Sequence, residues 1–238
     1  MNGWRTATLV AASMETPTAR TLRLRVPDRG RVLPGQHIDI RLTAEDGYQA
    51  VRSYSVAAAT GDDLLETTVQ ELTDGEVSPY LISGLEVGDE LEIRGPIGRW
   101  FIWRPTDPAP VQLIAGGSGV VPLMSMIRER ETAGTTVPFR LLYSVRSPDN
   151  DYYRAELAGL RAAGSLQVDY VYTRRSPADA ARRPGRLTSD ELASLVIPVD
   201  QRPEFRVCGP TAFVEQCARW LLDLGYPAAA IRTERFGG

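Results

Sequence analysis

Lysine is absent from this chain, and all 27 of its basic residues are arginine. Any anion site that needs a cation must therefore use a guanidinium group, and no lysine Schiff base can form. The two cysteines, Cys208 and Cys217, are too few for a disulfide framework or for the four thiolates of a typical iron–sulfur cluster. With His37 as the one histidine, a zinc site is not expected either. Any redox chemistry must come from an organic cofactor.

Long apolar runs are missing too: none reaches the length of about 18 residues that crosses a membrane. Residues 1–5 lack the charged-then-apolar pattern of a signal peptide. The net charge of −3 gives no basic excess to neutralise a nucleic-acid backbone. The sequence therefore predicts a cytoplasmic protein without membrane or nucleic-acid partners, and we expect a monomer.

The first part of the chain, up to about residue 105, has the pattern of β-structure. Thr21–Val26 alternates apolar and polar residues, and the turn Pro27-Asp28-Arg29-Gly30 ends it. Short strands at this spacing, without long helical patterns, indicate a small antiparallel barrel or sandwich. One short helix is predicted near Val77. The strands are predicted at 21–26, 38–42, 51–57, 64–71 and 90–94.

A proline-rich stretch, 104–110, reads as a linker between two domains, 1–106 and 107–238. Beyond it, buried-strand patterns alternate with amphipathic helices, which implies a doubly wound parallel sheet. Thr211 is predicted to cap a helix whose apolar stripe includes Cys217 as a core residue. The predicted strands are 111–115, 139–144, 166–172, 205–208 and 231–236, and two further helices are predicted at 122–131 and 152–162.

A glycine-rich turn, Gly117-Ser118-Gly119, joins the first of these strands to a helix beginning at Pro122. Glycine lets the backbone turn sharply and lets amides approach a pyrophosphate, and the helix N-terminus favours an anion. An ordinary strand–helix turn would look similar. The strand before it and the amphipathic helix after it favour a dinucleotide site.

Two later strand ends bear on the choice between NAD and NADP. Ser144-Val145-Arg146 and Thr173-Arg174-Arg175 each combine a hydroxyl with guanidinium groups, which suits a 2′-phosphate. The alternative is that these arginines are solvated loop residues. The pattern favours NADPH and leaves NADH open.

Six motifs occur in an order similar to that of the ferredoxin–NADP reductase superfamily. The resemblance covers essentially the whole chain and implies a six-stranded flavin-binding β-barrel followed by a nicotinamide-binding α/β domain. The motifs are Arg52-Ser53-Tyr54-Ser55, Gly75-Glu76-Val77-Ser78, Gly95-Pro96-Ile97-Gly98, Gly117 to Pro122, Cys208-Gly209-Pro210 and Glu234-Arg235-Phe236.

By this resemblance, the first domain holds FAD. Arg52 would bind the pyrophosphate, Tyr54 would pack on one face of the isoalloxazine ring, and Ser55 would hydrogen-bond near N5. The segment 75–78 would offer amides and a hydroxyl to the same phosphates. Tyr54 could instead be a core aromatic residue, and His37 is expected to start a strand near the surface of this domain.

The resemblance also implies roles in the second domain. Cys208, followed by Gly209 and Pro210, would line the nicotinamide pocket, Glu234 would sit beside the reactive centre, and Phe236 would cover the second flavin face. Cys208 could instead be a small buried residue and Phe236 a core aromatic residue. Two glycines follow Phe236, which leaves open whether nicotinamide must displace that ring.

The chain differs from plant-type members in lacking a lysine for the 2′-phosphate, which arginines such as Arg174 or Arg183 would replace. It also lacks the cysteines of a fused iron–sulfur domain. These features predict an NAD(P)H-dependent flavoprotein that passes single electrons to a separate ferredoxin, flavodoxin or oxygenase component. The alternatives are a flavin or ferric reductase with diffusible acceptors and a non-catalytic nicotinamide-sensing subunit.

Overall fold

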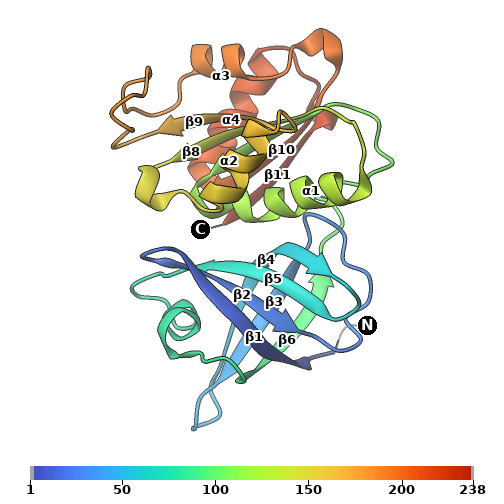
Figure 1. Cartoon of the computed structure of the whole chain (residues 1–238), viewed down its shortest axis with the longest axis vertical. Coiled ribbons are helices and arrows are strands. Elements are labelled where there is room, and N and C mark those ends of the chain that lie inside the picture. The colour runs from blue at the N-terminus through green and yellow to red at the C-terminus, as the bar shows by residue number, and fades with distance from the viewer. Residues whose placement is uncertain (1–2, 237–238) are drawn as a thin grey trace. The chain divides into compact units, whose positions relative to one another are not determined.

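The computed structural model of the chain describes residues 3–236. They form two compact units. The first takes in the chain up to Arg104 together with Met124–Glu129, and the second takes in Pro105–Leu123 and the chain from Arg130 onwards. Figure 1 shows a closed β-structure in the first unit and a sheet with flanking helices in the second.

The first unit is a closed antiparallel barrel, which confirms the predicted six-stranded architecture. Around the barrel the strands follow the order β1-β2-β5-β4-β3-β6. They are β1 (Arg5–Thr16), β2 (Ala19–Arg25), β3 (His37–Thr43), β4 (Gln49–Thr60), β5 (Leu64–Gln70) and β6 (Glu90–Ile97).

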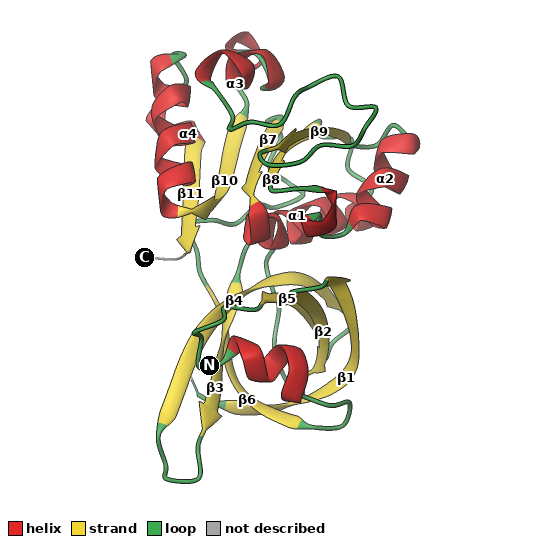
Figure 2. Ribbon diagram, turned by 90° about the vertical axis from the view of Figure 1, so that its left-hand side faces the viewer, coloured by secondary structure: helices red, strands yellow, loops and turns green. Residues whose placement is uncertain are grey.

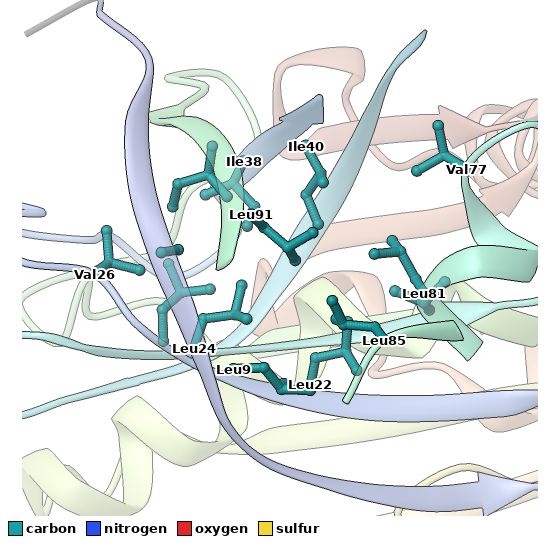
Figure 3. Packing of buried hydrophobic residues seen from close by; sticks show 14 of the residues in the cluster. Leu9, Leu22, Leu24, Val26, Ile38, Ile40, Val77, Leu81, Leu85 and Leu91 are labelled. Carbon is teal, nitrogen blue, oxygen red and sulfur yellow. The ribbon is translucent and has the colours of Figure 1, made fainter. Parts of the chain in front are cut away.

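The barrel core follows from residue alternation along the strands. On β2, Leu22 and Leu24 are fully buried, whereas Arg23 between them is exposed. Each such leucine contributes about 2 kcal/mol to stability by leaving water. The segment before β6 adds Val77 and Leu81 to the same cluster, which Figure 3 shows beside the strand residues. Residues far apart in the chain therefore close the barrel interior.

Strand β1 was not predicted, and its irregular register explains why. Its pairing with β2 shifts between Leu9 and Ala11 and again between Met14 and Thr16. Each shift breaks the period-two pattern that marks a strand in sequence. The short helix expected near Val77 is present as a π-helical turn, η1 (Tyr80–Gly84), preceded by helical Ser78 and Pro79.

The second unit is a five-stranded parallel sheet with helices on both faces, confirming the doubly wound prediction. The strand order is β11-β10-β7-β8-β9, and Figure 2 shows α1 and α2 on one side and α3 and α4 on the other. The strands are β7 (Val111–Gly116), β8 (Phe139–Val145), β9 (Gln167–Tyr172), β10 (Glu204–Pro210) and β11 (Ile231–Phe236), and the helices are α1 (Val120–Ala133), α2 (Arg154–Ala162), α3 (Ser189–Leu195) and α4 (Thr211–Asp223).

Helix boundaries differ from the sequence pattern in several places. Helix α1 begins at Val120, two residues before Pro122, directly after a short 3-10 turn over Gly117–Gly119. The predicted cap at Thr211 is wrong, because Pro210 precedes the helix and Thr211 is its first residue. Cys217 is fully buried in the core, as predicted.

Helix α3 was not predicted, although it carries a recognisable start signal. Thr188 accepts a hydrogen bond from the Glu191 amide, and the Glu191 side chain accepts one from the Thr188 amide, which forms a capping box. Among residues 3–236, no helix is long and apolar enough to cross a membrane.

Candidate functional site

Arg52 lies on β4 with about half of its side chain exposed (52%). Its guanidinium forms an ion pair with Glu76, and Nη1 donates to the Val51 carbonyl at 2.8 Å. An exposed arginine held by one surface carboxylate has N–H groups that a phosphate can reach. Arg52 therefore has the position and the charge needed for a flavin phosphate.

Ser53, Tyr54 and Ser55 continue along the same strand. Tyr54 is half-buried against the barrel core, and this burial raises the pKa of its phenol to about 12, so the ring stays neutral. Ser53 donates from Oγ to Asp39 Oδ1 at 2.6 Å, which assigns it a structural contact. Ser55 pairs with His37 across β3 and β4. A neutral ring and a hydroxyl thus follow the arginine.

His37 is the first residue of β3, as predicted, and it is the neighbour of Ser55 that the sequence pattern does not reveal. Burial lowers the pKa of His37, against the raising effect of Asp39. Its imidazole is therefore neutral at pH 7. Only the register of β3 against β4 brings these two residues together.

The segment 75–78 folds as a tight loop next to Arg52. Gly75 N donates to the Leu72 carbonyl at 2.8 Å, and the Leu72 amide donates to Ser78 Oγ at 3.0 Å. A Cβ on Gly75 would lie 2.8 Å from Ser78 Oγ, so the loop requires glycine. Val77 is fully buried, and Ser78 is almost so. The loop therefore places Glu76, its exposed member, at Arg52.

The glycine-rich turn lies at the carboxyl end of β7, where strand order reverses between β7 and β10. Ligands of doubly wound sheets bind at such a switch point. A Cβ on Gly119 would lie 2.1 Å from the Cys208 carbonyl oxygen, and one on Gly116 would lie 2.7 Å from the Phe213 ring. Gly117 has a φ of +54° with open space around it. The backbone of the turn thus packs against the backbone of β10 at Cys208, and the turn leads directly into the N-terminus of α1.

Cys208 and Glu234 are neighbours in the β10–β11 register. Cys208 is fully buried, and burial, with the Glu234 charge as a second cause, raises the pKa of its thiol well above the usual value. Burial also raises the pKa of Glu234 to about 7. The same register places Phe236, which is half-buried, opposite Pro210. A neutral thiol and a carboxyl that titrates near pH 7 therefore adjoin the switch point.

A cavity of about 600 Å³ opens beside the carboxyl ends of β8, β9 and β10. Ser144 and Thr173 contribute hydroxyl groups, and Arg186 contributes a guanidinium. No acidic residue is among the described residues that line it. Its volume is within the usual range for a small-molecule site. The remaining lining residues are Leu187, Pro210, Ala212, Phe213, Gln216, Cys217 and Trp220.

Arg186 is the arginine of this cavity, and sequence reasoning missed it. Arg146 and Arg174 are exposed nearby, joined by a hydrogen bond from the Arg174 amide to the Arg146 carbonyl at 2.9 Å, but neither lines the cavity. Arg175 pairs with Asp149 instead. No local sequence pattern marks Arg186, because its place at the cavity depends on the return of the loop to β9, where the Gly185 amide donates to the Tyr172 carbonyl at 3.0 Å.

The predicted site residues thus form two groups. Residues 52–55 and 75–78 come together in the first unit, and residues 117–122, 144, 173, 208–210, 234 and 236 surround the carboxyl edge of the sheet in the second. An exposed guanidinium beside a tight loop suits a flavin diphosphate. A glycine turn at a switch point, with hydroxyls and a guanidinium in an adjacent cavity, suits a nicotinamide dinucleotide. The residues present therefore fit both cofactors.

Two protein-family profiles match the chain. Residues 6–102 match the oxidoreductase FAD-binding domain, and residues 113–219 match the oxidoreductase NAD-binding domain. The matches correspond to the barrel and to most of the parallel sheet. The chain therefore binds FAD and a nicotinamide nucleotide.

Curated relatives have the same combination. The ferredoxin–NAD(P)+ reductase component of the naphthalene 1,2-dioxygenase/salicylate 5-hydroxylase systems of Ralstonia sp is 30% identical over 230 residues, covering 96% of this chain and 68% of that protein. A flavohemoprotein of Pseudomonas aeruginosa is 31% identical over 206 residues, covering 86% and 51%. The chain thus spans about half to two thirds of the length of these relatives.

Solved structures agree with these sequence matches. The FAD/NAD-binding domain of nitric oxide dioxygenase from Vibrio cholerae superposes with a TM-score of 0.88 at 28% identity, with full coverage of both chains. A ferredoxin–NADP+ reductase from Neisseria gonorrhoeae, with bound FAD and NADP, has the same fold, with a TM-score of 0.84 at 21% identity and 98% coverage of both chains. This chain belongs to the ferredoxin–NADP reductase superfamily and is an FAD-dependent NAD(P)H oxidoreductase.

Proposed function

We propose that this protein takes hydride from NADPH onto FAD and passes electrons singly to a separate redox protein. The observation that carries the choice of NADPH is the cavity with Ser144, Thr173 and Arg186 at the carboxyl edge of the sheet. A 2′-phosphate carries nearly two negative charges and accepts several hydrogen bonds. Two hydroxyls and a guanidinium supply both needs, whereas an NAD site uses a carboxylate there.

In the first unit, Arg52 would hold the flavin pyrophosphate together with amides of 76–78; the Gly75 amide, also expected to contribute, donates to the Leu72 carbonyl instead. Tyr54 would pack against the isoalloxazine ring, and Ser55 would donate a hydrogen bond near N5. A bound flavin supplies the conversion of hydride into single electrons, so the protein has to provide binding and orientation.

In the second unit, the turn 117–119 and the N-terminus of α1 would receive the nucleotide pyrophosphate. Pro122 removes no needed donor, because an N–H in the first helical turn has no partner within the helix. Glu234 would lie at the nicotinamide end of the site, beside Cys208. Phe236 as a cover for the flavin stays a prediction, as do the positioning roles of Gly209 and Pro210.

The test of the NADPH assignment is Arg186→Ala, with Arg183→Ala as the matched control. Both arginines are exposed in the same loop, but only Arg186 lines the cavity. We expect Arg186→Ala to raise the KM for NADPH at least about tenfold and to leave that for NADH within about twofold, since a charged hydrogen bond is worth roughly 1.5–3 kcal/mol. Steady-state kinetics with both nucleotides measures this.

Other outcomes of these kinetics are informative. Equal effects of Arg186→Ala on NADPH and NADH would remove the phosphate argument. The same experiment with Arg174→Ala decides whether the arginine outside the cavity contributes as well. An effect confined to Arg174→Ala would move the phosphate site to the exposed strand ends.

The acceptor is tested by electron transfer. The Ralstonia relative is the reductase component of oxygenase systems, which supports a ferredoxin or an oxygenase component as the partner here; a flavodoxin is the other protein acceptor we test. With NADPH, we expect cytochrome c reduction to rise several-fold when a ferredoxin or flavodoxin is added. Fast turnover of free FMN or ferric chelates, unchanged by any protein, would instead establish a reductase for diffusible acceptors. Purified protein that neither contains nor takes up FAD would favour a non-catalytic subunit.

A further inference from the structure

Tyr48, Glu76 and Arg52 form a continuous polar chain on the barrel surface. The Tyr48 hydroxyl donates to Glu76 Oε1 at 2.8 Å, and Glu76 Oε2 receives the Arg52 guanidinium. The Tyr48 bond and the Arg52 contacts lower the pKa of Glu76, so it is a carboxylate at neutral pH. A tyrosine and a negative charge therefore accompany the arginine proposed for the flavin pyrophosphate.

Tyr48 is held in place by the hairpin between β3 and β4. Its amide donates to Asp46 Oδ1 at 3.0 Å, and its carbonyl accepts from the Ala44 amide at 2.8 Å. Figure 2 shows this connection projecting beyond the strands of the barrel. Even so, 57% of the residue is exposed. The structure thus holds an aromatic face open to solvent.

The spacing along the chain matches the order of groups in FAD. Tyr54 and Arg52 are two residues apart on β4, so their side chains point to the same side of that strand, and Tyr48 lies in the turn directly before it. The Tyr48 hydroxyl and the Arg52 guanidinium contact the same Glu76 carboxylate, so the Tyr48 ring lies next to that guanidinium. On the other side, Tyr54 lies roughly 7 Å from Arg52 along the strand. A flavin ring, a pyrophosphate and an adenine follow one another along FAD in the same sequence.

We propose that the exposed ring of Tyr48 is the platform for the FAD adenine and that Glu76 selects FAD against FMN. This inference rests on the proposed placement of the pyrophosphate at Arg52. Base stacking on an aromatic side chain requires an accessible, immobile ring, and Tyr48 provides both features. FMN has no adenine, so it gains nothing from this ring.

Glu76 adds discrimination through charge. The terminal phosphate of FMN is a monoester with nearly two negative charges at pH 7, whereas each phosphate in the FAD diester carries one. The Glu76 carboxylate is paired with the Arg52 guanidinium, so it lies close to any phosphate bound there. It repels the doubly charged phosphate of FMN more strongly than a singly charged phosphate of FAD. The tyrosine therefore favours FAD, and the carboxylate disfavours its competitor.

The test is titration of the flavin-free protein with FAD, FMN and riboflavin, followed by flavin fluorescence. We expect Tyr48→Ala to weaken FAD binding about tenfold and to leave FMN and riboflavin within twofold, because only adenine contacts the ring. Tyr48→Phe, which keeps the ring and removes the hydroxyl, should bind FAD within about threefold of the unmodified protein. Equal losses of FAD and FMN in Tyr48→Ala, or no loss of FAD, would overturn the platform.

Glu76→Gln completes the experiment. We expect its affinity for FMN to rise by at least about fivefold more than its affinity for FAD, because one negative charge beside the phosphate is removed. Equal changes for both flavins would overturn the selectivity role. Arg52→Gln tests separately whether Arg52 binds the flavin phosphate. If this variant leaves the affinities for FAD and FMN unchanged, the pyrophosphate is not bound at Arg52, irrespective of the results for the Tyr48 variants.

Discussion

Glu234 shows at the scale of a single residue how burial sets charge. Its carboxyl has an ordinary pKa of 4.5, and burial raises it to about 7 in the folded protein. Cys208 beside it is kept neutral by the same desolvation. Close to neutral pH, Glu234 can therefore hold or release a proton at the edge of the sheet where we place nicotinamide.

This burial predicts a pH-dependent cost in stability. Between about pH 4.5 and 7 the folded chain binds the Glu234 proton more tightly than the unfolded chain, so the free energy of unfolding falls as pH rises. The cost is absent below that window and complete above it. Glu234→Gln should therefore gain stability relative to the unmodified protein by on the order of 3 kcal/mol at pH 8 and little at pH 4.5. Urea unfolding at both pH values measures the gain, with the exposed Glu215→Gln as the control. A gain that is the same at both pH values would contradict the burial argument.

The turn between β7 and α1 makes the corresponding point at the scale of an element. Gly119 is required by packing, because its Cβ would meet the Cys208 carbonyl oxygen at 2.1 Å, whereas Gly117 is required by its left-handed φ of +54°. Two glycines in one motif thus serve different purposes. The sequence pattern treats them alike.

Substitutions separate these purposes. Gly119→Ala forces two backbone segments apart, and we expect it to lower the free energy of unfolding by about 3 kcal/mol and to weaken NADPH binding at least about tenfold. Gly117→Asn, which tolerates the left-handed conformation and has open space, should cost no more than about 1 kcal/mol. Urea unfolding and nucleotide titration test both variants. Similar losses of stability in the two variants would show that the Gly119 contact is unimportant.

Element prediction succeeded where apolar and polar residues alternate along the sequence. This is so for Thr21–Arg25 of β2 and for β3, although the polar Asp39 of β3 is buried. β1 was missed because its register shifts against β2 interrupt the period, and α3 was missed although Thr188 and Glu191 form its capping box.

At the scale of the whole molecule, the described residues include a hydrophobic cluster in each unit. One cluster lies inside the barrel and includes Leu22, Ile40 and Leu81; another lies between the sheet and helices α3 and α4 and includes Phe205, Val207 and Leu221. Each unit buries its own apolar surface. A ligand should therefore stabilise first the unit that binds it.

Hydrogen exchange tests this expectation. FAD at about 100 times its Kd should raise the opening free energy of slowly exchanging amides in β2, β3 and β4 by up to about 2.7 kcal/mol. Amides of β8 and β9 serve as internal references, because we place no FAD contact there. Mass spectrometry of protected peptides, with and without FAD, provides the measurement. Unchanged exchange in the barrel strands would contradict the assignment of FAD to this unit.

The sequence by itself determined the two-part architecture, the arginine-only choice of cation and the motifs for FAD and nicotinamide, because each depends on residues close together in the chain. Tertiary structure decided which arginine lines the cavity. The loop between β9 and α3 passes the carboxyl ends of the strands, and this brings Arg186 to the cavity but not Arg174 or Arg183. It also decided the partner of Arg52 and the charge of Glu234. Contact and burial both depend on segments distant in sequence, so no local pattern could have supplied them.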